Sequence, residues 1–189
     1  MTVYIKNMVC NRCISAVEKV FNDLEVPVAA VHLGEVETTE NLNKTEIQNL
    51  DQQLQKIGFQ ILEDASKKII EKVKKVLIVK INELDISEDF VLSHFLAEKL
   101  AKDYSAISKT FSQNANITLE QFFILQKIEK VKELLLYDEF SLTEISNKLG
   151  YKSVQHLSSQ FKNTTGFTPS AFKTLKVKNR LPLDSIWIL

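Results

Sequence analysis

The sequence lacks the features of a membrane protein or an enzyme. It has no apolar run approaching the roughly 20 residues of a membrane-spanning helix, and its start, MTVYIKNM, is not a charged segment followed by a long apolar core. Its three histidines are scattered and its two cysteines lie together, which leaves no third group to orient a nucleophile and its base. We therefore expect a cytoplasmic protein that is not an enzyme and has no membrane partner.

The formal net charge of zero hides an uneven distribution of charge. Residues 90–189 contain 13 of the 24 basic side chains and 9 of the 24 acidic ones, for a net charge of +4. Residues 1–89 hold the other 11 basic and 15 acidic side chains, for a net charge of −4. A chain of 189 residues with 44% hydrophobic content can form two domains, and the second would be the basic one.

One long amphipathic helix is predicted over residues 119–137. Thr118 and Gln121 have the spacing of a capping box, which marks the start of a helix. Apolar side chains then recur at intervals of three and four, which would place them on one buried face. These side chains are Phe122, Leu125, Ile128, Val131 and Leu135.

The residues on either side of this helix are two versions of one pattern. Residues 103–118 and 153–168 match at an offset of 50, with Ile107 matching Leu157 and Phe111 matching Phe161. A short helix is predicted ahead of each copy, over residues 96–103 and 142–150. A short helix, a tight turn and a second helix with a polar outer face form a helix-turn-helix unit. The sequence thus predicts two units, at about residues 88–117 and 141–170, joined by the helix at 119–137.

Residues 87–176 resemble the C-terminal DNA-binding domain of AraC-type transcription regulators. The match is carried by Gly150, Tyr151, Ser153, Leu157, Ser158, Phe161, Lys162, Gly166, Thr168, Pro169 and Phe172. The resemblance implies a transcription regulator that binds double-stranded DNA. The linking helix would be about 28 Å long, close to the ~34 Å of one DNA turn, so that one chain could read two successive major grooves. A helix bundle that merely packs is the alternative.

The outer faces of the second helices are the candidate DNA-binding surface. Gln155 is the strongest candidate for base recognition because an amide can form two hydrogen bonds with adenine. Lys109 and Lys162 suit phosphate or guanine contacts, and His156 would contact phosphate or pack on the turn. The full set is Ser105, Ser108, Lys109, Ser112, Val154, Gln155, His156, Ser159 and Lys162.

Residues 1–64 are predicted to form a separate α/β domain, so the fold class is α+β. Strands and helices alternate in the order βαββαβ, which is a ferredoxin-like order. The expected elements are residues 3–6, 11–24, 27–33, 36–39, 45–57 and 60–62. An all-α double helix-turn-helix domain follows at residues 85–189.

Both cysteines lie in the segment MVCNRC, between the first strand and the first helix. In a reducing cytoplasm, a CxxC pair is more often a metal or redox site than a structural disulfide. The segment resembles the MxCxxC motif of heavy-metal-associated domains, which implies that Cys10 and Cys13 bind one soft metal ion, with Cu(I) favoured. A thiol–disulfide switch and a pair of small buried cysteines without function are the alternatives. Met8 is expected in the core.

Residues 65–84 form the connector, with a helix over residues 65–82 that either packs on a neighbouring domain or makes a homodimer. Asp85 and Glu88 have the spacing of a cap for the next helix, and Trp187 in the apolar C-terminal tail is expected to be docked. The leading interpretation is a DNA-binding regulator controlled by metal or thiol state. The alternative is a metal-trafficking or protein-docking module whose helical half does not bind DNA.

Overall fold

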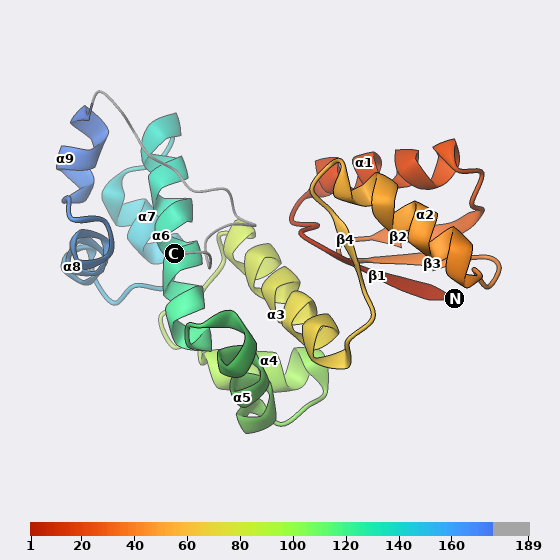
Figure 1. The fold of residues 1–189 in the computed structure, drawn as a ribbon. Helices are drawn as coiled ribbons and strands as arrows, with labels where there is room; N and C mark the ends of the chain where they lie inside the picture. The colour runs from red at the N-terminus through yellow and green to blue at the C-terminus, as the bar shows by residue number, and fades with distance from the viewer. Residues whose placement is uncertain (176–189) are drawn as a thin grey trace. The chain divides into compact units, whose positions relative to one another are not determined.

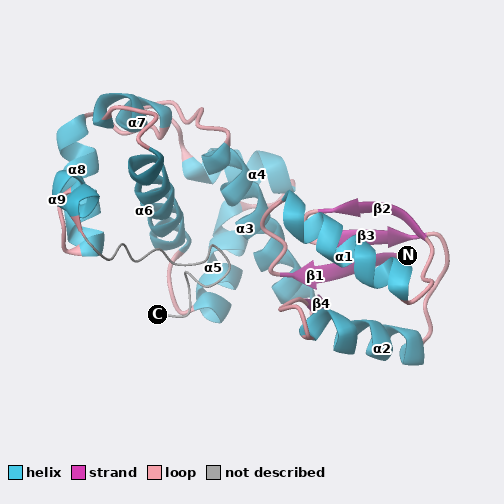
Figure 2. Cartoon of the chain, turned by 90° about the horizontal axis from the view of Figure 1, so that it is seen from above, coloured by secondary structure: helices cyan, strands magenta, loops and turns pink. Residues whose placement is uncertain are grey.

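The computed structural model describes residues 1–175, so the predicted docking of Trp187 lies outside the described residues. The chain divides into two compact units, Met1–Lys75 and Val76–Leu189. The first contains a small antiparallel sheet, and the second is helical over its described residues (Figures 1 and 2). The chain is therefore an α+β protein. No helix in the described residues is long and apolar enough to cross a membrane.

The first unit has the predicted element order. The elements are β1 (Thr2–Lys6), α1 (Asn11–Asp23), β2 (Val28–His32), β3 (Glu35–Thr38), α2 (Lys44–Gln55) and β4 (Gln60–Leu62). The strands form one sheet in the order β2-β3-β1-β4, and every pairing is antiparallel. Successive side chains of β1 point to opposite faces, so Val3 and Ile5 pack together with Phe21 of α1 and Leu54 of α2 in one buried cluster.

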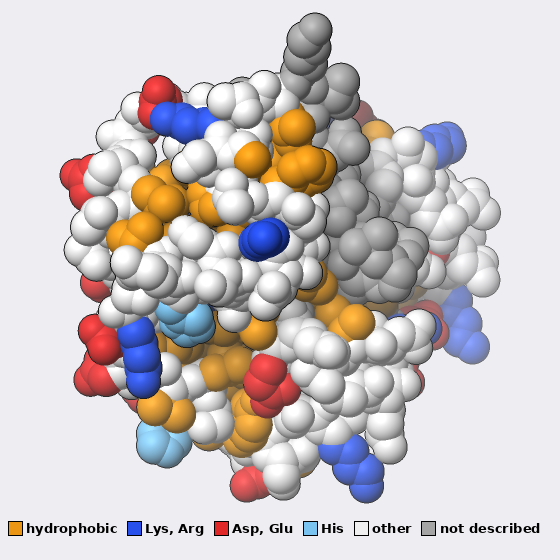
Figure 3. All heavy atoms as spheres, turned by 90° about the vertical axis from the view of Figure 1, so that its left-hand side faces the viewer, with side chains coloured by type: hydrophobic (Ala, Val, Ile, Leu, Met, Phe, Trp, Pro, Cys, Tyr) orange, Lys and Arg blue, Asp and Glu red, His pale blue; other side chains and the backbone are white. Residues whose placement is uncertain are grey.

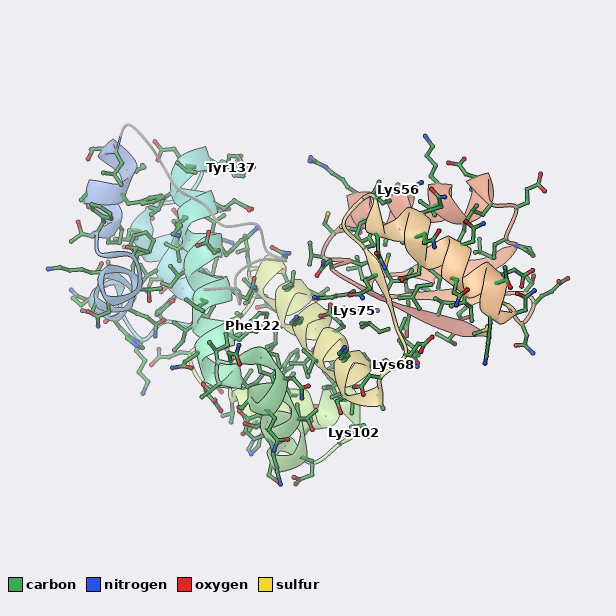
Figure 4. All side chains as sticks on the ribbon, viewed as in Figure 1. Lys56, Lys68, Lys75, Lys102, Phe122 and Tyr137 are labelled. Carbon is green, nitrogen blue, oxygen red and sulfur yellow. The ribbon has the colours of Figure 1, made fainter. Side chains whose placement is uncertain are left out.

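Helix α3 (Ala65–Asn82) belongs to both units, since the first unit ends at Lys75. The ammonium groups of Lys68 and Lys72 each lie 4.9 Å from the centre of the Tyr4 ring, and Lys75 pairs with Glu35 of β3 at 3.7 Å (Figure 4). Tyr4 lies on the face of β1 opposite Val3, so the first half of α3 covers the second face of the sheet. Most apolar side chains of α3 are buried or half-buried within the chain, while Val79 is exposed.

The second unit consists of helices around one long central helix. Its elements are α4 (Leu92–Leu100), α5 (Tyr104–Ala115), α6 (Leu119–Tyr137), α7 (Leu142–Lys148), α8 (Val154–Thr165) and α9 (Pro169–Thr174). The predicted cap by Asp85 and Glu88 is wrong, because α4 begins only after Val91 and has no side-chain cap. The residues ahead of it instead form turns on either side of Ile86, which makes a parallel bridge with Leu149.

Helix α6 is buried more completely than an amphipathic helix would be. The predicted capping box of Thr118 and Gln121 is present, and four of the five predicted core residues are buried, with Leu125 half-buried. The prediction of a single buried face is wrong, because Gln126, Lys127, Glu129 and Lys132 are buried as well. The reason is that α5, α7, α8 and α9 all pack on α6 and surround it.

Candidate functional site

Helices α5 and α8 have equivalent boundaries at the offset of 50 residues found in the sequence. The side chain of Asp103 accepts a hydrogen bond from the Ala106 N–H at the start of α5, and Ser153 accepts one from the His156 N–H at the start of α8. Both helices end in the left-handed conformation, at Asn116 and Gly166. The two helices are thus repeated in backbone as well as in sequence.

Aromatic contacts fix which face of each helix points inward. The rings of Phe111 on α5 and Phe122 on α6 lie 5.4 Å apart (Figure 4), and the rings of Phe161 on α8 and Phe172 on α9 lie 5.5 Å apart. All four side chains are buried. Because residues on one helical face recur every three or four positions, the opposite faces of α5 and α8 are free to meet a ligand.

The structure places most of the predicted DNA-binding residues on these free faces. Ser108 and Val154 are half-buried at the flank, while the others are exposed. The exposed ones are Ser105, Lys109, Ser112, Gln155, His156, Ser159 and Lys162. Two further exposed amides at equivalent positions, Gln113 and Asn163, were missed, although the spacing of four from Lys109 and Ser159 would have identified them. On the side shown in Figure 3, the Lys and Arg side chains are scattered singly, and some lie beside Asp or Glu side chains.

The turn that leads into α8 is tightly packed. Gly150 has a left-handed backbone (φ +65°), and a Cβ atom there would lie 2.6 Å from the Ser87 carbonyl oxygen. The Tyr151 hydroxyl donates a hydrogen bond to the Gln160 side chain at 2.8 Å, and the His156 ring meets the Tyr151 ring edge-on at 5.4 Å. His156 thus contacts the turn while remaining exposed.

The two thiols lie together at the start of α1. Cys10 is the N-cap residue, and its Sγ atom is 3.6 Å from that of Cys13. Burial raises the pKa of the Cys13 thiol. Burial also acts to raise the pKa of the Cys10 thiol. This pKa is nevertheless held below its usual value by hydrogen bonds from the Cys13 and Arg12 backbones and by the charge of Arg12. Cys10, which is exposed, is therefore the more readily ionised thiol.

The donor set fits a soft ion with two thiolate ligands. At about 2.3 Å per metal–sulfur bond, two ligands span ~3.8 Å in a bent arrangement, close to the 3.6 Å between the two Sγ atoms, and ~4.6 Å in a linear one. No group of three or more His, Cys, Asp or Glu side chains that could hold a metal occurs in the described residues. Met8 is 3% exposed and packs in the core, as expected from the sequence.

The loop that precedes the thiols is hydrogen-bonded to α3. The backbone carbonyl of Asn7 lies 3.9 Å from the Cys13 sulfur. The backbone N–H of Asn7 donates a 3.2 Å hydrogen bond to the Glu71 carboxylate. Glu71 also pairs with Lys74 at 2.8 Å, and Lys74 is buried. The thiol pair and α3 are therefore connected by a short chain of polar contacts.

Part of the second unit is similar to known proteins. Residues 96–174 match the family model described as a helix-turn-helix domain. The chain is 30% identical over 78 residues to the Msm operon regulatory protein of Streptococcus mutans, which is 41% of this chain and 28% of that protein.

It is also 32% identical over 69 residues to the Xylose operon regulatory protein of Escherichia coli, which is 36% of this chain and 18% of that protein. The C-terminal domain of the two-component response regulator yesN from Fusobacterium nucleatum is 29% identical, with a TM-score of 0.45, over 52% of this chain and 95% of that one. The chain thus spans less than a third of the length of the two operon regulatory proteins.

Proposed function

We propose that this protein is a sequence-specific, DNA-binding transcription regulator whose activity depends on the state of Cys10 and Cys13. The observation that carries the proposal is the pair of equivalent helices, α5 and α8, each with an exposed polar face, in a domain built around α6. Two relatives of this domain are named as operon regulatory proteins. The metal or redox control rests on the spacing of the two thiols and on their contacts.

Helix α6 has 19 residues, so it is about 28 Å long. That length suits two reading helices that enter successive major grooves about one turn apart. Gln155 is suited to pair with adenine, while the hydroxyls of Ser105, Ser112 and Ser159 can donate or accept at several bases. Lys109 and Lys162 would contact phosphates, which position the protein without reading the sequence.

The thiol pair is the proposed input site. A soft ion such as Cu(I) would supply the signal when bound by both sulfurs, and oxidation of the pair to a disulfide is the alternative signal. Either event changes the surroundings of the Cys13 sulfur, which contacts the Asn7 carbonyl. Asn7 in turn holds Glu71 on α3, and α3 continues as far as Asn82 in the second unit. This continuous path supports coupling between the thiols and the DNA-binding domain.

The test is a paired titration of the full chain under reducing conditions. Duplexes are first enriched from a random-sequence library by the wild-type protein, and their binding is then measured with and without Cu(I). We expect one ion per chain and a several-fold change in DNA affinity, since coupling energies between sites are typically ~1–3 kcal/mol. The double variant Cys10→Ser/Cys13→Ser should lose both effects.

Different outcomes separate the parts of the proposal. Stoichiometric metal binding with unchanged DNA affinity would favour metal trafficking, because an ion with equal affinity for both states shifts no equilibrium. No response to metal or oxidant would leave the first unit as a docking or dimerisation module. Sedimentation at several protein concentrations tests the predicted homodimer through residues 65–82, and cytoplasmic location stays a prediction.

A further inference from the structure

A buried lysine lies at the centre of the second helix-turn-helix unit. Lys127 on α6 is 7% exposed, and it forms no ion pair with any carboxylate in residues 1–175. A buried cation without a partner costs stability, and Lys is rarely buried for this reason. A lysine in this position therefore needs an interaction that offsets the cost of its burial.

Aromatic rings take the place of a carboxylate. The Lys127 ammonium lies 3.7 Å from the centre of the Tyr151 ring and 5.5 Å from that of Phe123. Both distances are within the range at which the negative face of a ring attracts a cation, and the attraction is stronger where water is excluded. Tyr151 is itself 3% exposed, so the contact lies out of water.

The Tyr151 side chain in turn contacts α8, the proposed DNA-recognition helix of the second helix-turn-helix unit. Its hydroxyl donates to the side chain of Gln160, and its ring contacts that of His156. Gln160 and His156 are both on α8, and His156 is next to Gln155 on the exposed face. Three polar or aromatic contacts thus connect α6, through Tyr151, to the helix that carries the predicted base-reading residue.

We propose that Lys127 is a positioning residue for DNA recognition: its charge fixes the Tyr151 ring, and the ring fixes the orientation of α8. This inference rests on the proposed DNA-binding function. Burial lowers the pKa of Lys127 to about 8, so the positioning charge is lost in mildly alkaline solution. The titratable groups that adjoin the ammonium or its ring are Tyr151, whose pKa is raised by burial, and His156.

The experiment measures binding of the library-enriched duplex and of a scrambled duplex between pH 7 and pH 9. Lys127→Met removes the charge but keeps the apolar stem, and Lys127→Arg keeps the charge at every pH. Lys130→Met is the matched control, because Lys130 is a lysine of the same helix that pairs with Glu133 instead of a ring. At pH 7 we expect Lys127→Met to bind the enriched duplex about five- to thirty-fold more weakly, with scrambled-duplex binding and the control changed less than about two-fold.

The pH profile separates positioning from a general structural role. Enriched-duplex affinity of the wild type should fall as pH rises through about 8, whereas the profiles of Lys127→Met and Lys127→Arg should show no such step. In the absence of DNA, backbone amide hydrogen exchange across α8 should be faster in Lys127→Met than in the wild type. Exchange across α5 serves as the internal reference and should not change. Equal enriched-duplex affinity and equal α8 exchange in wild type and Lys127→Met would overturn the inference. If the wild type enriches no duplex, the proposed function fails, and α8 exchange alone then decides whether Lys127 positions this helix.

Discussion

Replacing Gly150 with alanine should destabilise the second helix-turn-helix unit far more than the same change at Gly166. Both glycines have left-handed backbones, with φ of +65° and +80°. A Cβ atom at Gly166 would meet no atom within 4 Å. At Gly150 it would lie 2.6 Å from the Ser87 oxygen and 2.7 Å from Cγ2 of Ile86, and real Cβ contacts are not that short.

The magnitudes follow from these two environments. Gly166→Ala should cost about 1 kcal/mol, which is the strain of a left-handed alanine. Gly150→Ala has the same strain and must also displace the segment at residues 86–87, at a typical overpacking cost of ~1–3 kcal/mol. That displacement would weaken the 3.1 Å hydrogen bond from the Ile86 N–H to the Lys148 carbonyl, adding about 1 kcal/mol. The total is roughly 3–5 kcal/mol.

Thermal unfolding followed by circular dichroism measures the difference. For a unit of this size, each kcal/mol lowers the melting temperature by roughly 4–8 °C, so Gly150→Ala should lose at least about 12 °C. Amide hydrogen exchange should become faster in α7 and α8 and stay unchanged in residues Met1–Lys75. Melting temperatures that fall equally in the two variants would refute the argument from close packing.

Three further predictions address recognition and stability. Gln155→Ala should weaken binding to an enriched duplex by about 1–3 kcal/mol and leave scrambled-duplex binding unchanged; equal losses on both would argue against base reading. Burial lowers the pKa of Lys127 from 10.5 to about 8, so the folded state loses this proton at a lower pH than the unfolded state does. The free energy of unfolding in urea should therefore rise by roughly 3 kcal/mol between pH 8 and pH 10.5. Lys127→Met should lack this rise, and a rise of the same size in that variant would exclude Lys127 as its source. Ala101 has a left-handed backbone with φ +48°, so Ala101→Gly should raise the free energy of unfolding by about 0.5–1 kcal/mol; a lower melting temperature would contradict this.

Local signals in the sequence were sufficient for most element positions. The capping box at Thr118 marks the start of α6 as predicted, and a capping box at Ser141 begins α7 in the same way. The matched positions Ile107 and Leu157 are both buried, because the same 3.6-residue period applies to both copies. The start of α4 was misplaced, since the spacing of Asp85 and Glu88 imitates a cap while Ile86 is held by Leu149, far along the chain.

Features that depend on distant contacts could not be predicted. The hydrogen bond between Asn7 and Glu71 joins residues 64 positions apart, and no local pattern indicates it. Burial of Lys127 is similar, because lysine at that position fits an exposed helical face equally well until the surrounding helices are placed. Periodicity alone identifies one apolar face of α6, but it does not reveal that neighbouring helices cover the other faces.

The most direct test of the proposed function is a hydroxyl-radical footprint of the full chain on an enriched duplex. If α5 and α8 enter successive major grooves, the footprint should show two protected patches on one face of the DNA, about one helical turn or roughly ten base pairs apart. Gln155→Ala should weaken one patch more than the other, because α5 does not depend on that residue. A single patch, or protection that does not depend on DNA sequence, would contradict the account of two reading helices built around α6.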